Sequence, residues 1–122
     1  MFLAALLLAV PNSYSNEIEL DGVVIDRTIS RFGKDFFFYY TSYWRELPST
    51  EGLTVTVHEV VYPQAGTRLW LEVEQTKIYE TYFGRRQNDV KQAAEQAILR
   101  SINEVARIRA SEMTGGSLDE GF

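Results

Sequence analysis

The chain contains no cysteine and a single histidine among its 122 residues. Without cysteine there is no disulfide framework, no thiol nucleophile, no cysteine-based zinc site and no lipidated N-terminal cysteine. With His58 as the one imidazole, a transition-metal site is not expected. Gly-x-Ser-x-Gly, Walker-type and Gly-x-Gly-x-x-Gly motifs are also missing from the sequence. We therefore expect no cofactor, no metal and no enzymatic activity.

Positive charge is scarce as well. The chain has 12 Lys and Arg against 17 Asp and Glu, a formal net charge of −5. Binding to phosphates or to an anionic lipid surface needs clustered cationic side chains, so we expect no nucleic-acid partner and no membrane-surface partner. The local exception is the turn Gly84-Arg85-Arg86. It is either a solvated loop or part of an interface with the acidic face of a neighbouring copy.

A long apolar run occurs only at the N-terminus. Residues 1–10 are almost purely apolar, and Pro11 and small polar residues follow up to Ser15. This order is typical of a signal peptide with its cleavage site. The run is shorter than the roughly 20 apolar residues that cross a bilayer. We predict a signal peptide over residues 1–15, export of the chain and no direct membrane span; the alternative is a buried N-terminal strand or helix.

Apolar and aromatic side chains are plentiful in the chain. Apolar residues make up 45% of it, with 7 Phe, 7 Tyr and 2 Trp. One domain of this size can therefore be stable through its own core, without disulfides. We place this domain at residues 16–110. Residues 111–122, which combine Gly115-Gly116 with Asp119-Glu120, are predicted to form a flexible acidic tail.

Hydrophobic periodicity predicts a small α+β domain in the order β-α-β-β-β-α. Because the elements do not alternate strand and helix throughout, we expect an antiparallel sheet of about four strands with two helices on one face. The chain is predicted to begin with an acidic strand over 17–20 and a second extended piece over 23–25, followed by a helix that is capped by Thr28 or Ser30 and ends before a loop at 47–52. A strand over 53–58, which can continue over 60–62, comes next, and strands over 69–74 and 77–83 form a hairpin. The last predicted element is a helix capped by Asn88 or Asp89.

Each helix has an apolar face at spacings of three and four. The predicted face of the first helix consists of Ile29, Phe32, Phe36, Tyr40 and Tyr43. Residues 36–40 are apolar all round, so we expect this helix to be covered by the sheet and by a partner chain. Gly33 costs about 1 kcal/mol inside a helix, which indicates close packing of another backbone. The predicted face of the last helix consists of Val90, Ala94, Ala97, Ile98, Ser101, Ile102, Val105 and Ile108.

Trp70 interrupts the polar side of its strand. Leu69, Leu71 and Val73 share one face of the strand, whereas Trp70 shares the other face with Glu72 and Glu74. An exposed Trp is a common anchor in protein interfaces; the alternative is a Trp covered by its own loop. The two glutamates alternate with apolar residues as on a solvated strand face, although a carboxylate pair of the glycosidase type is an open alternative. His58 is interpreted as an ordinary surface or edge histidine.

The segment Asp26-Arg27-Thr28-Ile29-Ser30-Arg31-Phe32-Gly33-Lys34-Asp35-Phe36-Phe37 resembles the Asp-x-Thr-Ile/Val…Gly-His-Asp-Phe-Tyr opening of the CsgE family of curli secretion factors. Further matches extend the resemblance over nearly all of residues 17–110, and the ordered set is more specific than any single piece. They are Trp44, Leu53-Thr54-Val55, Glu59, Pro63, Gly66, Tyr79-x-Thr81-Tyr82, Asp89 and residues 93–97. Within the motif, Gly33, Asp35, Phe36 and Trp44 are the expected structural residues.

The chain departs from the family pattern at three places. Lys34 replaces the usual His and Phe37 the usual Tyr, and the loop at 58–67 lacks the Arg and Trp of the family. If this loop contacts a partner in the family, Tyr62 or Trp70 is the candidate to substitute here.

The resemblance implies a soluble periplasmic factor without enzymatic activity. Such a factor would bind the periplasmic mouth of the curli secretion channel (CsgG-like) as a homo-oligomeric ring. It would also bind the unfolded curlin subunit (CsgA-like) and prevent premature polymerisation. Two patches are expected to build the ring, namely the aromatic first helix and the Arg85-Arg86 turn. The candidate partner-binding residues are Trp70, Tyr62, Arg85, Arg86, Phe37 and Tyr39.

Two other functions are compatible with the residues alone. One is a periplasmic peptide- or ligand-binding module unrelated to curli, with Trp70 facing the ligand. The other is a small cell-wall hydrolase that uses a pair of carboxylates.

Overall fold

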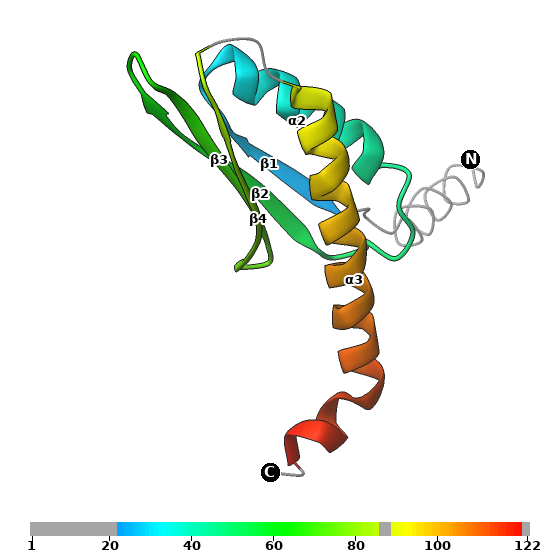
Figure 1. Ribbon diagram of the computed structural model, residues 1–122. Helices are drawn as coiled ribbons and strands as arrows, with labels where there is room; N and C mark the ends of the chain where they lie inside the picture. The colour runs from blue at the N-terminus through cyan, green and yellow to red at the C-terminus, as the bar shows by residue number, and fades with distance from the viewer. Residues whose placement is uncertain (1–21, 86–88, 121–122) are drawn as a thin grey trace, which may run out of the picture.

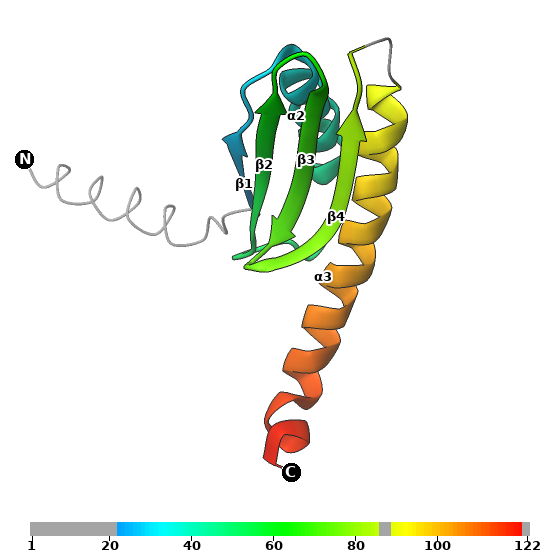
Figure 2. The same cartoon turned by 60° about the vertical axis from the view of Figure 1, so that its left-hand side comes forward.

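A computed structural model describes residues 22–85 and 89–120, with side chains up to residue 114. Four strands form one sheet, and both helices lie on the same face of it (Figures 1 and 2). The elements are β1 (Val23–Arg27), α2 (Arg31–Trp44), β2 (Thr54–Tyr62), β3 (Gly66–Val73), β4 (Thr76–Phe83) and α3 (Val90–Glu120). The predicted signal peptide (1–15), the predicted strand at 17–20 and Arg86 lie outside the described residues.

The α+β class, the two helices and the order β-α-β-β-β-α are confirmed. The prediction of a purely antiparallel sheet is wrong. The strand order is β1-β2-β3-β4, with β1 parallel to β2 and the other two pairs antiparallel. The physical reason is that α2 carries the chain back along the sheet, and a helical crossover of this kind joins parallel strands.

The three antiparallel strands are joined by short connections. Residues 63–65 link β2 to β3, and Glu74-Gln75 link β3 to β4, which confirms the predicted hairpin. Gly66 opens β3 with a φ of 132°, and a Cβ built there would lie 2.2 Å from the carbonyl oxygen of Phe83. Only glycine therefore allows the first turn to sit this close to the end of β4.

Helix α2 begins after Ser30, whose side chain accepts a hydrogen bond from the backbone N–H of Gly33 at 3.0 Å. It ends at Trp44, before the loop that the sequence predicted at 47–52. The buried line is Gly33, Phe36, Tyr40 and Trp44. The predicted apolar face is therefore partly wrong, because Ile29 precedes the helix and is 69% exposed. Because Gly33 has no side chain, the helix backbone approaches the sheet most closely along this line.

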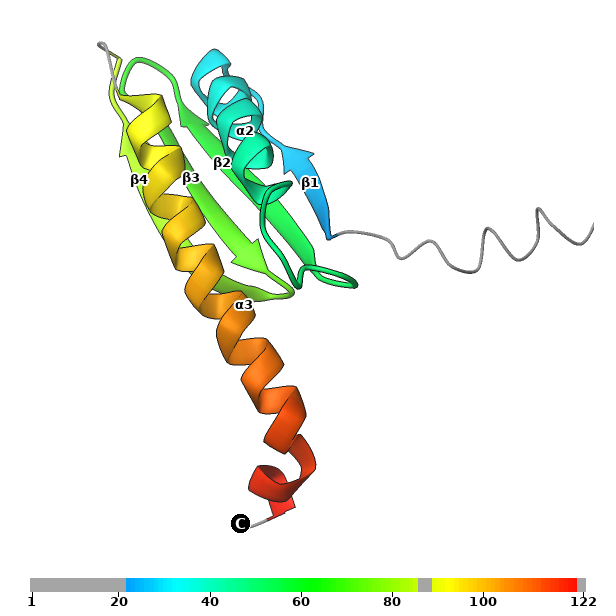
Figure 3. The same cartoon turned by 90° about the vertical axis from the view of Figure 1, so that its right-hand side faces the viewer.

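Helix α3 begins after Asp89, whose carboxylate accepts from the backbone N–H of Gln92 at 3.0 Å. Most of its predicted face is buried, and Ser101 bonds the hydroxyl of Tyr40 on α2 at 2.6 Å. Ile102 is an exception, since it is 42% exposed. It lines a hollow with Leu47 and Pro48 at one side of the helix, whereas Val105, further along, is buried again. The last turns of the helix project beyond the sheet (Figure 3).

The helix continues to Glu120. The predicted acidic tail over residues 111–122 thus overlaps its last turns, and the mobility of that tail stays a prediction. Within the described ranges, no helix combines enough length with enough apolar character to cross a membrane.

Candidate functional site

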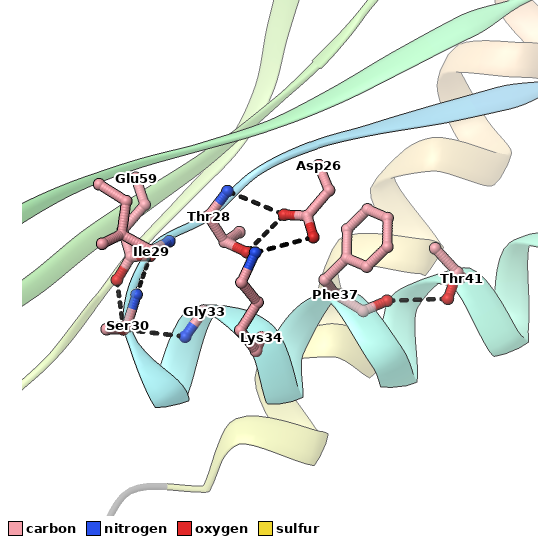
Figure 4. Close-up of polar contacts among 9 residues, drawn as sticks. All are labelled: Asp26, Thr28, Ile29, Ser30, Gly33, Lys34, Phe37, Thr41 and Glu59. Atoms are coloured by element: carbon pink, nitrogen blue, oxygen red, sulfur yellow. Dashed lines mark hydrogen bonds and ion pairs between the residues drawn. The ribbon is translucent and has the colours of Figure 1, made fainter.

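The Asp26–Lys34 part of the family motif forms a polar turn between β1 and α2 (Figure 4). The carboxylate of Asp26 accepts the backbone N–H of Thr28 at 2.8 Å and also the Thr28 hydroxyl. Its other oxygen lies 3.1 Å from Nζ of Lys34, one turn into the helix. Burial alone would raise the pKa of Asp26, but the bonds from Thr28 and Lys34 outweigh burial and lower that pKa. The turn therefore fixes the angle at which the chain enters α2.

Glu59 of β2 anchors the same turn from beneath. It is a buried carboxylate on the inner face of the sheet. Its Oε1 accepts the backbone N–H groups of Ile29 and Ser30 at 2.6 and 2.9 Å. Its Oε2 accepts the hydroxyl of Thr67 at 2.5 Å and also the hydroxyl of Ser30. One carboxylate thus collects the free donors at the start of the helix, which otherwise have no intrahelical acceptor.

Gly33 lies directly over this carboxylate. A Cβ built at Gly33 would lie 2.3 Å from Oε1 of Glu59 and 2.8 Å from Cβ of Thr28. The close neighbour is therefore a side chain of the sheet and not the strand backbone that the sequence predicted. Burial raises the pKa of Glu59, yet the bonds from Ile29, Ser30 and Thr67 together lower it below its ordinary value. We name Glu59, Gly33, Ile29, Ser30 and Thr67 the carboxylate cradle.

The cradle makes Gly33 a structural residue, and the same holds for Phe36 and Trp44, which are buried in the core. The indole N–H of Trp44 donates to the carbonyl oxygen of Gly22 at 3.2 Å and so ties the end of α2 to the start of β1. Asp35 differs from these residues, because its side chain lies exposed on α2.

Trp70 lies on the outer face of the sheet, opposite both helices. His58 of β2 stacks on its ring with 4.9 Å between centroids and 9° between planes. The guanidinium carbon of Arg68 lies 4.5 Å from the ring centroid. The Trp70 side chain is half-buried by these neighbours. The sequence placed it correctly on the polar side of its strand, but the ring is held between two cationic or ionisable side chains. We name His58, Arg68 and Trp70 the outer stack.

Acidic side chains hold the outer stack in place. Oε1 of Glu72 lies 3.2 Å from Nε2 of His58, and Oε2 of Glu72 accepts the indole N–H of Trp70 at 3.3 Å. Glu80 on β4 pairs with Arg68 at 2.8 Å and with Lys77 at 3.0 Å. On the outer face, therefore, a network of paired charged side chains surrounds one aromatic ring.

Tyr62 and Arg85 meet at one end of the sheet. Together with Phe32 and Pro63 they border a hollow of about 270 Å³ that opens beside the start of α2. The hydroxyl of Tyr62 also accepts a bond from Nε of Arg68 at 3.3 Å. Two of the predicted partner-binding residues thus lie in one corner, which adjoins the outer stack.

Phe37 and Tyr39 lie on opposite flanks of α2. Phe37 is one turn beyond Lys34, which pairs with Asp26 of β1, so it belongs to the β1 side (Figure 4). Tyr39 is one turn before Tyr43, whose hydroxyl bonds Glu95 of α3 at 3.3 Å. Both side chains are half-buried against the core. The exposed aromatic residue of α2 is Phe38, with 64% of its surface accessible.

Sequence reasoning missed that Glu59 is a buried anchor of the turn and that Phe38 is the exposed aromatic residue of α2. A signal for Glu59 was present, because Leu53, Val55 and Val57 define the inward positions of the strand and Glu59 continues their period of two. An acid at an inward position predicts a buried carboxylate with dedicated donors. Phe38 carried no comparable signal, since the whole run 36–40 is aromatic.

The described residues contain no group of three or more His, Asp or Glu side chains placed to hold a metal ion. Their polar groups are engaged with one another, and in the described part of the chain no buried side-chain nitrogen or oxygen lacks a partner.

Comparison with known proteins agrees with the motif. The family model for the curli assembly protein CsgE matches residues 20–120. Two curated relatives, from Escherichia coli O6:H1 (strain CFT073) and Escherichia coli O157:H7, are each 26% identical to this chain over 98 residues. Each alignment covers 80% of this chain and 74% of the relative, and both relatives are described as curli production assembly/transport component CsgE.

Proposed function

The chain belongs to the CsgE family of curli assembly proteins, and we propose that it acts as a periplasmic accessory factor of curli secretion. In this role it binds the unfolded curlin subunit and the outer-membrane secretion channel. It directs the subunit to export and keeps it from polymerising in the periplasm.

The outer stack carries this proposal. It places a half-buried Trp, a His and an Arg at the centre of a sheet face that neither helix covers (Figure 2). An extended chain that lies across this face can contact the Trp70 ring. Its charged side chains can also replace one member of the ion pairs around that ring. Such contacts are individually weak, so the bound chain is released readily. Binding to the unfolded subunit lowers its free concentration and delays pairing of its aggregation-prone segments by mass action.

The test is curlin polymerisation followed by amyloid-dye fluorescence, with the purified chain added from sub-stoichiometric to equal ratios. We expect a lag that lengthens with dose. Trp70→Ala should remove most of this delay, whereas Trp70→Phe, which keeps an aromatic ring, should keep part of it. Lys91→Ala, an exposed change on α3, is the matched control and should leave the delay intact. A folded wild-type protein that causes no delay would refute the binding of curlin.

The corner formed by Tyr62 and Arg85 supports contact with the secretion channel. It combines an exposed aromatic ring, an exposed cation and a hollow of about 270 Å³, and Arg86 follows directly in the sequence. Arg85→Glu should weaken co-purification with the channel, and the double change with Arg86→Glu should weaken it further. Lys91→Glu makes the same change in charge on α3 and should have no effect. Equal retention of all three variants would remove this corner from the channel interface.

A further inference from the structure

Strand β1 forms one edge of the sheet, and no described strand lies on its other side (Figure 2). It pairs with β2 in parallel, and the N–H of Val23 donates to the carbonyl oxygen of Leu53 at 2.9 Å. The backbone of Val23 therefore faces β2. Along a ladder, residues that bond one neighbour alternate with residues that face away from it. Val24 and Asp26 thus direct two N–H groups and two carbonyl oxygens away from β2, and we name this side of β1 the open edge.

The side chains of β1 indicate what kind of polypeptide fits the open edge. Arg27 is paired with His58, whose ring lies in the outer stack, so Val23, Ile25 and Arg27 are on the outer face of the sheet. Val23 is 51% exposed and Ile25 is 37% exposed. Arg27 is also exposed, and none of the described carboxylates forms an ion pair with it. A strand that pairs here would meet two apolar side chains and one unpaired cation.

The opposite edge of the sheet, formed by β4, is less suited to such pairing. Natural sheets protect an edge with charged side chains, with β-bulges or with a neighbouring element. β4 carries the ion pair of Lys77 with Glu80, and its register against β3 shifts between Leu71 and Glu72. Helix α3 also runs beside it (Figure 2). Among the described residues, β1 has neither a register shift nor an element beyond it, so β1 is the edge at which a further strand can pair.

We propose that the open edge binds an extended polypeptide segment as an additional antiparallel strand, with an acidic residue opposite Arg27 and apolar residues opposite Ile25 and Val23. In this mode of binding, backbone hydrogen bonds supply affinity and alternate side chains supply specificity. Antiparallel pairing is slightly the more stable direction. Because it reverses the order of residues, the bound segment has the pattern acidic-x-apolar-x-apolar. The inference rests on the proposed function, and it specifies which segments of the unfolded subunit are bound.

Continuity with the outer stack favours the unfolded subunit as the occupant. The register sets Arg27 opposite His58 and His58 opposite Trp70, so their side chains form one row across the outer face. A segment at the open edge adds one more side chain to the end of this row. A neighbouring part of the same polypeptide can then lie over Trp70. The strand ends at Arg27, so the contact is short and the bound segment can be released.

The test is NMR hydrogen exchange of the isotope-labelled full chain with a synthetic peptide, Ser-Glu-Thr-Val-Thr-Val-Ser. At a peptide concentration of about twice the dissociation constant, the amide protons of Val24 and Asp26 should exchange about 3-fold more slowly. The amide of Ile25, which faces β2, and the amides of β4 should not change. N-methylation of both Thr residues of the peptide, whose N–H groups face β1, should abolish the protection. N-methylation of both Val residues, whose N–H groups face away, should preserve it.

A charge exchange tests the assigned register. A peptide with Lys in place of Glu should bind the wild-type chain about 3- to 10-fold more weakly, because repulsion replaces an exposed ion pair. Arg27→Glu should reverse this preference, whereas Lys91→Glu, the matched control on α3, should keep it. An unchanged preference in Arg27→Glu would overturn the proposal. Slow exchange of Val24 and Asp26 in the free chain would overturn it as well, because another part of the chain or a second copy would already cover the edge.

Curlin polymerisation separates this inference from the proposed function. Val24→Pro removes one open N–H, and proline is tolerated on an edge strand where that group faces outward. It should shorten the delay of polymerisation, whereas Val24→Ala, which keeps the N–H, should shorten it much less; circular dichroism checks that both variants are folded. If Val24→Pro delays like wild type while Trp70→Ala does not, the inference fails and the proposed function stands. If wild type causes no delay but the peptide still protects Val24 and Asp26, the proposed function fails and binding at the open edge stands.

Discussion

The two faces of the sheet use charged side chains in opposite ways. On the inner face, the one buried carboxylate among the described residues, Glu59, is surrounded by fixed donors and closed over by Gly33. On the outer face, Glu72 pairs with His58 and Glu80 pairs with Arg68, and these partly exposed pairs lie around Trp70. Buried hydrogen bonds to a charge cannot be replaced by water, whereas exposed ion pairs can. The inner face therefore determines stability, and the outer face is free to exchange partners.

The largest effect is expected at the centre of the inner face. Glu59→Ala leaves the N–H groups of Ile29 and Ser30 without their acceptor, while the hydroxyl of Thr67 keeps the carbonyl oxygen of Val60 at 3.0 Å. Because two part-buried backbone donors lose their acceptor and a buried side chain is removed from the inner face, we expect the free energy of unfolding to fall by about 3–5 kcal/mol. Urea denaturation at pH 7 measures the loss. Glu59→Gln, which keeps the shape and an acceptor oxygen, should lose much less. Similar losses for both variants would show that the charge matters more than the acceptor.

The next largest effect is expected at Gly33. In Gly33→Ala the added methyl group would clash with the Glu59 carboxylate at 2.3 Å, so either the cradle opens or α2 lifts from the sheet. We expect a loss of about 2–3 kcal/mol. Gly84→Ala is the matched control, because a Cβ there meets no atom within 4 Å. Thermal and urea denaturation compare the two variants, and equal midpoints would contradict the close packing at Gly33.

Acid should weaken the carboxylate cradle and the Asp26 turn beside it. The pKa values of Glu59 and Asp26 are both lowered in the folded protein, from ordinary values of 4.5 and 3.8. Below these ordinary values the unfolded chain binds more protons than the folded one, so stability falls as the pH is lowered further, through the folded pKa values. Urea denaturation between pH 7 and pH 3 measures this decline. Glu59→Gln should make it shallower, and an unchanged slope would exclude Glu59 as a contributor.

The smallest effect is expected on the outer face. Glu80→Gln breaks the exposed pairs with Arg68 and Lys77. Exposed ion pairs each contribute roughly 0–1 kcal/mol, so the free energy of unfolding should change by less than about 1 kcal/mol. Curlin delay should change measurably all the same, because Arg68 is freed to move from the Trp70 ring. A large loss of stability here would remove the functional distinction between the two faces.

The sequence predicted the strands, the hairpin and both helices because their apolar residues repeat with a period of two or at spacings of three and four. It predicted Trp70 on the polar side of its strand for the same reason. It failed on the direction of β1, since periodicity does not distinguish parallel from antiparallel pairing. It also placed Ile102 in the core, because a helical pattern does not reveal how wide a strip of the helix the sheet and α2 cover.

The candidate site was predicted in parts. Tyr62 was chosen as a substitute for loop residues that the family has and this chain lacks, and Arg85 as part of a cationic turn. Both line one hollow because β2 and β4, on either side of β3, end at the same end of the sheet. The clamping of Trp70 by His58 and Arg68 depends on the strand register that sets His58 opposite Trp70. Phe37 and Tyr39 were chosen from an aromatic run, and only the rotation of α2 about its axis separates their environments.

By itself, the sequence determined the class of fold, the family and the lack of cysteine chemistry, because these follow from composition, periodicity and an ordered motif. Tertiary structure alone decided that the motif serves a buried carboxylate, that Trp70 is held in a stack, and that the end of α3 stands free of the sheet. These features arise from contacts between residues some 10 to 60 positions apart. Local sequence patterns do not predict contacts between residues so far apart, because such contacts form only when the helices pack on the sheet.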